Sequence, residues 1–498
     1  MQRVLPPSHE LASHGLALFD IAHTRLLEQR AAASLPPYAL MARAGEATAR
    51  LALALTPHAR QIWIAAGPGN NGGDGLEAAY HLQRWGKRVV ISLIGDAALL
   101  PADARAALAR AQAAGAKIDG DAMAPPDLAI DALLGIGASR PPQGALEATI
   151  RHLNALPCPV LAIDVPSGLH ANTGQPLGAA CVTAAHTLTM IGLKPGLFSA
   201  AGRDHAGSVW LDTLGIDASG DVPEAWLSSA GAVRARRHTQ HKGNFGDLAV
   251  VGGANGMCGG ALLAARAGQA AGAGRVFVEL LDPAAGMGLD ALRPELMFRH
   301  GWAQGAPAVL GASTVVCGCG GGDAVRGPLP RLLSLARRLV LDADALNALA
   351  RDAVLLPLLH ARAGRGLATV LTPHPLEAAR LLDCTTAEVQ ADRLRAANAL
   401  AARYRSIVVL KGSGSVIAAP EQIARINSTG NAALASAGTG DVLAGWLGGR
   451  WAQLGAGDEP ATAFAVAIQA VAEHGAAAEP QPPGALLAGD LIERLHRR

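Results

Sequence analysis

The feature that most constrains the fold is an alternation of short β-rich runs with longer helical stretches, present twice along the chain. The first series runs QIWIAA, RVVISLIG, LAIDALLG, VLAIDVPSG, HTLTMIG and SVWLDTLG. The second series runs DLAVVGG, RVFVELL, STVVCG, RLVLDAD, ATVLTPHP and SIVVLKGSGSVIAAP. Such alternation is typical of parallel sheets with helices on both faces. We therefore predict an α/β protein of two doubly wound domains, each a three-layer sandwich, the first of them Rossmann-like.

The two series are separated by a polar, turn-rich stretch with few β-formers, from Gly215 to Gln240. A chain of 498 residues is long enough for two or more domains. We predict a first domain over residues 1–220, a linker over 221–235 and a second domain over 236–498. A helix is expected in the first domain over 38–55, where apolar residues recur at helical spacing.

Composition excludes several classes of protein. The net charge is only +2 and no basic tract occurs, so nucleic acid is not an expected partner. The longest uncharged stretch, 248–265, is interrupted by glycines and Asn255, and the N-terminus lacks the apolar core of a signal peptide, so no membrane association is expected. Six cysteines without metal-binding spacing indicate reduced thiols in a cytoplasmic protein. The Ala/Gly-rich helices are compatible with a homo-oligomer, which we expect.

The stretch GPGNNGGDGLEAAYHL, residues 67–82, follows a β-rich run and leads into a helical one. Ligands of doubly wound sheets bind at this kind of junction, where glycines admit a phosphate and the helix N-terminus supplies amide donors. The oxygens of Asn70, Asn71 and Asp74 could hold a cation or a ribose. The alternative is a tight turn in which Asn and Asp bond only to the local backbone.

Two further strand ends carry aspartates, Asp131 and Asp164, which we expect to meet that junction at one rim of the sheet. Together, Asn71, Asp131 and Ser167 offer oxygen ligands without thiol or imidazole, a set that suits a hard cation rather than zinc. Lys194 also follows a strand and, if near Asp164, could share protons with it. The alternatives are turn or cap aspartates and an exposed lysine.

Five segments of this half, LMARAG, GPGNNGGDGLEAAYHL, DALLGIG, DVPSGL and LKPGL, resemble the NAD(P)H-hydrate epimerase family of the YjeF N-terminal type, over roughly residues 10–220. The resemblance implies that Asn71, Asp131 and Ser167 bind K⁺ and that Asp164 and Lys194 transfer protons. It implies that the hydrated dinucleotide is contacted by Asn70, Asn71, Gly72, Gly73, Asp74, Gly135, Ile136, Gly137, Ala138, Ser139, Arg140, Pro141 and Asp164.

In the second half, SAGTGDVLAGWLGG (436–449) places a glycine loop and Asp441 directly before an apolar helix. Backbone amides of residues 437–440 could form an anion hole for a transferring phosphoryl group, with Asp441 as the base toward a hydroxyl. The string by itself is weakly specific.

The companion segments make the second half specific: HKGNFGDLAVVGG, GGALLAARAGQAAGAGRV, VVCGCGGG, LVLDADALNAL, LTPHPLEAARLL, VVLKGSGSVI and NSTGNAALASAGTGD. Over roughly residues 230–498 they resemble the ribokinase-like superfamily and, within it, the ADP-dependent NAD(P)H-hydrate dehydratases. The resemblance implies Mg²⁺ with ADP as the phosphoryl donor, although the sequence leaves ADP against ATP open. It implies nucleotide contacts by Lys411, Gly412, Ser413, Gly414, Ser415 and Gly440, and hydrate contacts by Ala261, Gly322, His374 and Asp441.

Alternatives remain at several of these positions. His374 could be a structural turn histidine and Lys411 a surface lysine, while Asp342 and Asp344 could cap the following helix and are left unassigned. The loop Gly318-Cys319-Gly320-Gly321-Gly322 departs from the G-P-G-L-G pattern of the family, which predicts a more flexible loop and weaker substrate binding. A second departure, GNAALA for G-N-P-G-x-A, is mild.

Together the resemblances imply a bifunctional repair enzyme for hydrated nicotinamide cofactors, NADHX and NADPHX, with no preference between the two readable from the sequence. The first half would interconvert the C6 epimers, and the second would dehydrate the S epimer with ADP, giving AMP and phosphate. The alternative is a ribokinase-like small-molecule kinase fused to a non-catalytic ligand-binding module, since Asp441 and the anion hole would serve either reaction.

Overall fold

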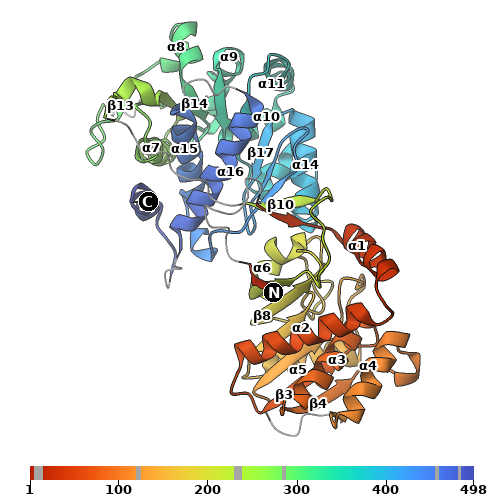
Figure 1. The fold of residues 1–498 in the computed structure, drawn as a ribbon. Coiled ribbons are helices and arrows are strands. Elements are labelled where there is room, and N and C mark those ends of the chain that lie inside the picture. The colour runs from red at the N-terminus through yellow and green to blue at the C-terminus, as the bar shows by residue number, and fades with distance from the viewer. Residues whose placement is uncertain are drawn as a thin grey trace. The chain divides into compact units, whose positions relative to one another are not determined.

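The computed structural model describes residues 1–4, 15–118, 125–228, 238–282, 288–454, 459–479 and 484–497. Its internal contacts form two compact units, and the chain passes from the first to the second between Ala225 and Trp226. Figure 1 shows each unit as a sheet flanked by helices. The expected linker overlaps β10 (Ala225–Ser228), because hydrogen bonds to a neighbouring strand draw these residues into the second sheet. The domain limits otherwise stay a prediction, with residues 229–235 outside the described ranges.

The first unit is built on a sheet with the strand order β1-β9-β8-β7-β6-β3-β4-β5. All neighbours are parallel except the pair β1 and β9. The sheet grows from β3 toward β5, then returns to β6 on the other side of β3, so β3 and β6 flank a topological switch point. The strands of this sheet are β1 (Gln2–Arg3), β3 (Gln61–Ala66), β4 (Arg88–Leu93), β5 (Lys117–Ile118), β6 (Leu128–Ala132), β7 (Val160–Ile163), β8 (His186–Met190) and β9 (Ser208–Asp212). Strand β2 (Leu16–Leu18) is not part of this sheet.

Two separate hydrophobic clusters cover the two faces of this sheet. Alternate residues of β3 divide between them: Ile62 and Ile64 belong to one cluster, and Trp63 belongs to the other. The result is the predicted doubly wound, three-layer sandwich. Its helices are α1 (Ile21–Ser34), α2 (Ala39–Leu55), α3 (Asn70–Arg84), α4 (Ala102–Ala113), α5 (Ala145–Ala155) and α6 (Gly202–His205), so the helix expected over 38–55 is confirmed as α2.

The sheet of the second unit contains the strand order β13-β12-β11-β14-β15-β16-β17-β18-β19-β10. The seven strands β13, β12, β11, β14, β15, β16 and β17 are parallel to one another, whereas β18 is antiparallel to both β17 and β19. Every β-rich run of the second series is confirmed as a strand. These strands are β11 (Asp247–Gly252), β12 (Arg275–Leu280), β13 (Met297–Phe298), β14 (Thr314–Cys317), β15 (Arg338–Leu341), β16 (Thr369–Leu371), β17 (Ile407–Leu410), β18 (Val416–Ala418) and β19 (Arg425–Asn427).

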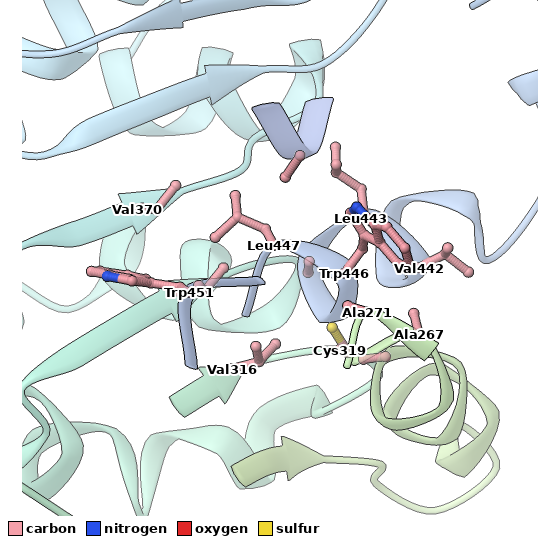
Figure 2. Packing of buried hydrophobic residues seen from close by; sticks show 14 of the residues in the cluster. Ala267, Ala271, Val316, Cys319, Val370, Val442, Leu443, Trp446, Leu447 and Trp451 are labelled. Atoms are coloured by element: carbon pink, nitrogen blue, oxygen red, sulfur yellow. The ribbon is translucent and has the colours of Figure 1, made fainter. Parts of the chain in front are cut away.

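The helices of the second unit are α7 (Cys258–Ala270), α8 (Pro307–Ala312), α9 (Leu329–Leu335), α10 (Asp344–Arg351), α11 (Leu355–Gly364), α12 (Pro375–Leu382), α13 (Thr386–Ala391), α14 (Arg393–Tyr404), α15 (Thr439–Ala452), α16 (Pro460–Ala477) and α17 (Ala488–His496). Large side chains of α15, including Trp446 and Leu447, share a core with small residues of α7 (Figure 2). The two backbones approach closely, because a β-carbon on Gly445 would lie 1.9 Å from the carbonyl oxygen of Ala264. This contact fixes α15, whose first turn carries Asp441.

None of the helices in the described ranges combines the length and the apolar character that a membrane span requires.

Candidate active sites

The glycine-rich stretch of the first unit lies at the switch point, after β3, and helix α3 already begins at Asn70. Most of its glycines are explained by packing within the protein. A β-carbon on Gly72 would lie 2.0 Å from the carbonyl oxygen of Gly67, and one on Gly75 would lie 2.4 Å from the β-carbon of Ala132. A β-carbon on Gly69, the N-cap, would meet no atom within 4 Å. The glycines therefore bring α3 onto the sheet, and the backbone is open to a ligand only at Gly69.

The carboxylate of Asp131, at the end of β6, is fully buried and bound to Ser167. The Ser167 hydroxyl donates to Oδ1 at 2.6 Å, and the Ser167 backbone amide donates to Oδ2 at 2.8 Å. Burial raises the pKa of Asp131 to about 6, although the bonds from Ser167 act in the opposite direction.

Asn71 lies in the same neighbourhood, because a β-carbon on Gly135 would lie 3.2 Å from Asn71 Oδ1. Its Nδ2 atom is buried and finds no hydrogen-bond partner within the described ranges. A buried amide N–H without an acceptor is costly unless a ligand supplies that acceptor. The oxygen atoms of Asn71, Asp131 and Ser167 are of the chemical kind that hard cations prefer.

Asp164 and Lys194 form the central ion pair of the first unit. Lys194 is fully buried, and its Nζ donates to Asp164 Oδ1 at 2.5 Å, to Thr189 Oγ1 at 3.0 Å and to the Met190 carbonyl at 2.7 Å. Lys194 is thus not the exposed lysine of the alternative interpretation. Asp164 follows β7 with a positive φ of 66°, a conformation that costs free energy in residues other than glycine. The second carboxylate oxygen faces the backbone amide of Ile136 at 3.4 Å.

Two carboxyl groups stand close enough to interact with this pair. Burial, together with the charges of Asp164 and Glu28, raises the pKa of Asp74 well above its usual value. Burial and the Asp164 charge also raise the pKa of Glu28, on α1. Glu28 belongs to no motif and is not predicted from the sequence, since only folding brings α1 to this site.

The loop after β6, residues 135–141, borders the same site. Ile136 contacts Asp164, as described, and a β-carbon on Gly137 would lie 3.5 Å from the guanidinium of Arg25 on α1. Ser139, Arg140 and Pro141 are exposed, whereas Ala138 is half-buried. The predicted residues of the first unit therefore gather at one rim of the sheet, beyond the carboxyl ends of β3, β6 and β7.

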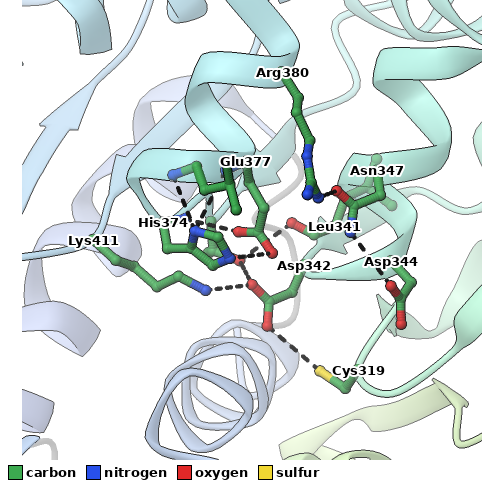
Figure 3. A network of polar contacts seen from close by, with 11 residues as sticks. Cys319, Leu341, Asp342, Asp344, Asn347, His374, Glu377, Arg380 and Lys411 are labelled. Atoms are coloured by element: carbon green, nitrogen blue, oxygen red, sulfur yellow. Dashed lines mark hydrogen bonds and ion pairs between the residues drawn. The ribbon is translucent and has the colours of Figure 1, made fainter. Parts of the chain in front are cut away.

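The centre of the second site is Asp342, which directly follows β15 and is almost fully buried (Figure 3). Lys411 Nζ and Thr372 Oγ1 each donate to Asp342 Oδ1 at 2.7 Å. Asp342 is therefore not a helix cap, and helix α10 has no side-chain cap. Burial lowers the pKa of Lys411, but the charges of Asp342 and Glu377 outweigh it, so the net shift is upward.

Asp441 lies in the first turn of α15, facing the Asp342 cluster. One oxygen or sulfur atom from each of Cys319, Asp342 and Asp441 lies within 4.8 Å of the other two. Burial raises the pKa of Asp441 to about 6, with a further contribution from the negative charge of Asp342. A carboxylate with this pKa suits general-base catalysis near neutral pH.

His374 caps helix α12 through its side chain. Nδ1 accepts from the backbone amides of Leu376 and Glu377, and Nε2 lies 3.2 Å from Glu377 Oε1. Burial and the charge of Lys411 lower the pKa of His374, and burial raises the pKa of Glu377 to about 7. The turn-histidine interpretation thus describes the structural role of His374, while 46% of its side chain stays exposed for a ligand.

The predicted nucleotide loop, Lys411 to Ser415, connects β17 to β18. Hydrogen bonds from Arg393 hold the start of this loop. The guanidinium of Arg393 is buried and donates to the carbonyls of Leu410 and Lys411 at 3.1 Å each. Gly412 has a φ of 137°, and a β-carbon there would lie 2.9 Å from the Arg393 guanidinium. A β-carbon on Gly440 would lie 3.2 Å from Lys411 Nζ, so the Lys411 side chain reaches the first turn of α15.

The remaining predicted residues differ in accessibility. Ala261 has no exposed surface, and it packs beneath the turn at Gly252 and Gly253. The backbone amide of Gly322 donates to Asp344 Oδ2 at 2.8 Å. A cavity of about 210 Å³ opens beside Gly322, lined by Asp323, Arg326, Asp344, Asn347, Ala348 and Arg351.

The segment 318–322, where the sequence departs from the family pattern, is held by backbone hydrogen bonds. The amides of Gly253 and Ala254 donate to the carbonyls of Cys319 and Gly320, and the amide of Gly318 donates to Val251. Gly318 must be glycine, since its φ is 119° and a β-carbon would lie 2.0 Å from the carbonyl oxygen of Asp342.

Each unit thus has a doubly wound sheet whose parallel strands end in an aspartate–lysine pair, one member of which is buried, beside the first turn of a helix. This combination defines a two-domain α/β enzyme with two separate sites of the nucleotide-binding type. Family models agree: residues 37–196 match the YjeF-related protein N-terminus, and residues 248–496 match NAD(P)H-hydrate dehydratase.

Curated relatives extend over nearly the whole chain. The bifunctional NAD(P)H-hydrate repair enzyme Nnr of Escherichia coli (strain K12) is 38% identical over 482 residues, covering 92% of this chain and 89% of that protein. Nnr of Coxiella burnetii is 34% identical, covering 96% and 98%. The chain belongs to the family of bifunctional NAD(P)H-hydrate repair enzymes. Among solved structures, the ADP/ATP-dependent NAD(P)H-hydrate dehydratase from Bacillus subtilis is 27% identical, with a TM-score of 0.42, covering 53% of this chain and 92% of that one.

Proposed function

We propose that the first unit interconverts the R and S epimers of hydrated NAD(P)H and that the second unit dehydrates the S epimer with ADP. Family membership supports both activities, and the two partly buried aspartate–lysine pairs supply the chemical groups. The observation that carries the proposal is that one chain has an acid–base pair at each of two sheet rims.

In the first unit, Asp164 is the proposed proton acceptor and donor at the nicotinamide ring, and Lys194 holds its carboxylate in place. All three hydrogens of the Lys194 ammonium are donated to acceptors, so its charge is directed at Asp164 rather than at solvent. Residues 70–74 and 135–141 are the proposed walls of the binding site. Asn71, Asp131 and Ser167 would hold K⁺, which would supply positive charge beside the buried carboxylate of Asp131.

In the second unit, Asp441 is the proposed base that takes the proton of the C6 hydroxyl. The hydroxyl oxygen then bonds to the β-phosphorus of ADP, the bond to the bridging oxygen breaks and AMP leaves. Amides at the start of α15 and the Lys411 ammonium balance the charge of the transferring group. Phosphate next departs with the C6–O bond electrons as the ring nitrogen donates its lone pair, and loss of the C5 proton restores the double bond.

The nucleotide is proposed to lie on Lys411, Gly412, Ser413, Gly414, Ser415 and Gly440, and the hydrate on Gly322, His374 and Asp441, with Ala261 shaping the site from beneath. Mg²⁺ would accompany the phosphates of ADP, since hard cations prefer phosphate and carboxylate oxygens. All six cysteines are free thiols, which supports the proposed cytoplasmic location. The homo-oligomer stays a prediction. Light scattering tests it by measuring the molar mass of the protein in solution.

The experiment supplies a mixture of both NADHX epimers with Mg²⁺ and either ADP or ATP, and follows the absorbance of the recovered reduced nicotinamide. The wild-type protein should restore all the NADH, Asp441→Asn none, and Asp164→Asn only the fraction present as the S epimer, after correction for spontaneous epimerisation. A wild-type protein that instead phosphorylates another alcohol and restores no NADH supports the kinase alternative.

A further inference from the structure

The segment that departs from the family pattern places a thiol inside the second site. Cys319 is fully buried, and its Sγ lies 3.7 Å from Asp342 Oδ2. The three potential ligand atoms of Cys319, Asp342 and Asp441 come from three different elements: the loop after β14, the end of β15 and the first turn of α15. Figure 3 shows Cys319 pointing at Asp342.

The spacing of these atoms fits a tetrahedral metal ion. With a zinc–sulfur bond of about 2.3 Å and a zinc–oxygen bond of about 2.0 Å, two tetrahedral ligands lie about 3.5 Å apart. The observed separation of Cys319 Sγ and Asp342 Oδ2, 3.7 Å, is close to this value. The third ligand, from Asp441, lies within 4.8 Å of both, so it needs only a small shift to close the site.

The two oxygens of Asp342 are divided between two tasks. Oδ1 accepts from Lys411 and Thr372, whereas Cys319 is the hydrogen-bond partner of Oδ2 within the described ranges. Oδ2 is therefore directed into the cluster and available to a metal. The three ligands, as a thiolate and two carboxylates, carry −3 and Lys411 carries +1, so a divalent ion balances this group, while Asp344 and Glu377 add further negative charge nearby.

We propose that Cys319, Asp342 and Asp441 form a zinc site, with water as the fourth ligand, and that zinc bound there blocks the dehydratase reaction. On binding, the Cys319 thiol releases its proton to solvent as the sulfur–zinc bond forms. The ion also occupies the carboxylate of Asp441, so this base can no longer accept the substrate proton. Thiolate ligation favours zinc over Mg²⁺, which prefers oxygen ligands, so the Mg²⁺ of the reaction does not compete strongly.

The binding test uses the full-length protein without nucleotide and titrates it with Zn²⁺ by calorimetry and with Co²⁺ by absorbance. Bound cobalt should show a thiolate charge-transfer band in the wild-type protein and in Cys317→Ser, which removes a buried thiol two residues away. Cys319→Ser should lose the band and weaken zinc binding at least about 10-fold, because it removes a direct ligand. Equal zinc affinity and an equal cobalt band in Cys319→Ser and the wild-type protein would overturn the proposal.

The inhibition test rests on the proposed dehydratase activity and measures NADH recovery at increasing Zn²⁺ with Mg²⁺ and ADP in excess. Each variant is normalised to its own rate without zinc. The zinc concentration for half-inhibition should rise at least about 10-fold in Cys319→Ser and stay unchanged in Cys317→Ser, and a zinc-selective chelator should restore the rate. Inhibition that is identical in all three proteins contradicts the site. A protein without dehydratase activity refutes the proposed function, and the cobalt spectrum still decides the metal site.

Discussion

Lys194 Nζ lies 2.5 Å from Asp164 Oδ1 and has no exposed surface. A buried ammonium is stable only while its donors are satisfied and its charge is balanced. Here the hydroxyl of Thr189 and the carbonyl of Met190 accept from the other two N–H groups of the ammonium. Of the three hydrogen-bond acceptors, only Asp164 carries a negative charge. The pair therefore serves both the stability of the first unit and its proposed proton transfer.

Replacing Asp164 by Asn should lower the epimerase rate by about 10²–10⁴-fold, the usual contribution of a general acid–base group. Asn tolerates the positive φ of this position, so the change removes the charge without adding backbone strain. The rate is measured from the second, slow phase of NADH recovery in a mixture of epimers. Asp96→Asn is the matched control, because Asp96 is an exposed helix cap and Asn caps equally well. An unchanged slow phase in Asp164→Asn contradicts the assigned role.

The dehydratase rate should depend on pH through Asp441, whose pKa is raised to about 6 by burial and by Asp342. A base acts when deprotonated, so the rate constant should fall as the pH drops below about 6 and reach a plateau above it. The measurement is kcat/KM against pH, with the S epimer as substrate.

Asp342→Asn should move this acidic limb to lower pH. It removes a negative charge beside Asp441 and leaves Lys411 without its carboxylate partner, and both changes favour the ionised form of Asp441. Thermal unfolding of the same variant separates this effect from a general loss of folding. A limb that stays in place shows that Asp441 is not the titrating group.

Potassium should stabilise the protein in a pH-dependent way through Asp131. The folded pKa of Asp131, about 6, lies above its unfolded value, so its ionisation lowers stability as the pH rises from about 4 to about 6. K⁺ bound at the carboxylate should offset this loss, so its stabilising effect should grow over the same window and be complete above pH 6. At ten times its dissociation constant, K⁺ should add about 1.4 kcal/mol.

The measurement is calorimetric unfolding of the full-length chain in KCl and in choline chloride at equal ionic strength. In Asp131→Asn the difference between the two salts should vanish, whatever the absolute stability of that variant. A potassium effect that persists in Asp131→Asn places the ion elsewhere.

Gly445→Ala should destabilise the second unit by about 1–3 kcal/mol, because the added β-carbon has no room against the Ala264 carbonyl on α7. The shift would also move the first turn of α15, so dehydratase activity should fall with stability. Gly259→Ala on the facing helix is the control: a β-carbon there meets nothing within 4 Å, and Ala favours helix over Gly. Denaturant unfolding of both variants gives the comparison, and equal stabilities contradict the packing argument.

The strands were predictable from the sequence because their signal is local. A fully buried parallel strand reads as a short apolar run ended by glycine, and QIWIAA therefore predicted β3 at Gln61–Ala66 without knowledge of its neighbours. Short strands such as β13, with two residues, lack such a run and depend on a neighbour for their hydrogen bonds.

The candidate site residues were only partly predictable. Asp164 and Lys194 both follow strands, which predicts that they can meet, whereas Asp342 also follows a strand but its position suits a helix cap equally well. Glu28 has no motif at all. The roles of Asp342 and Glu28 depend on which charged side chains the fold places next to them. This is a property of the sheet order rather than of the local sequence.

By itself, the sequence determined the two doubly wound units, the strands and the motif-bearing ends of those strands, because hydrophobic periodicity and turn chemistry act over a few residues. Only the tertiary structure decided that most glycines of residues 67–75 serve the packing of α3 and that Cys319 joins Asp342 and Asp441. These outcomes depend on close approach between segments far apart in the chain, where the free energy of burial and charge pairing is set by neighbours that no local pattern encodes.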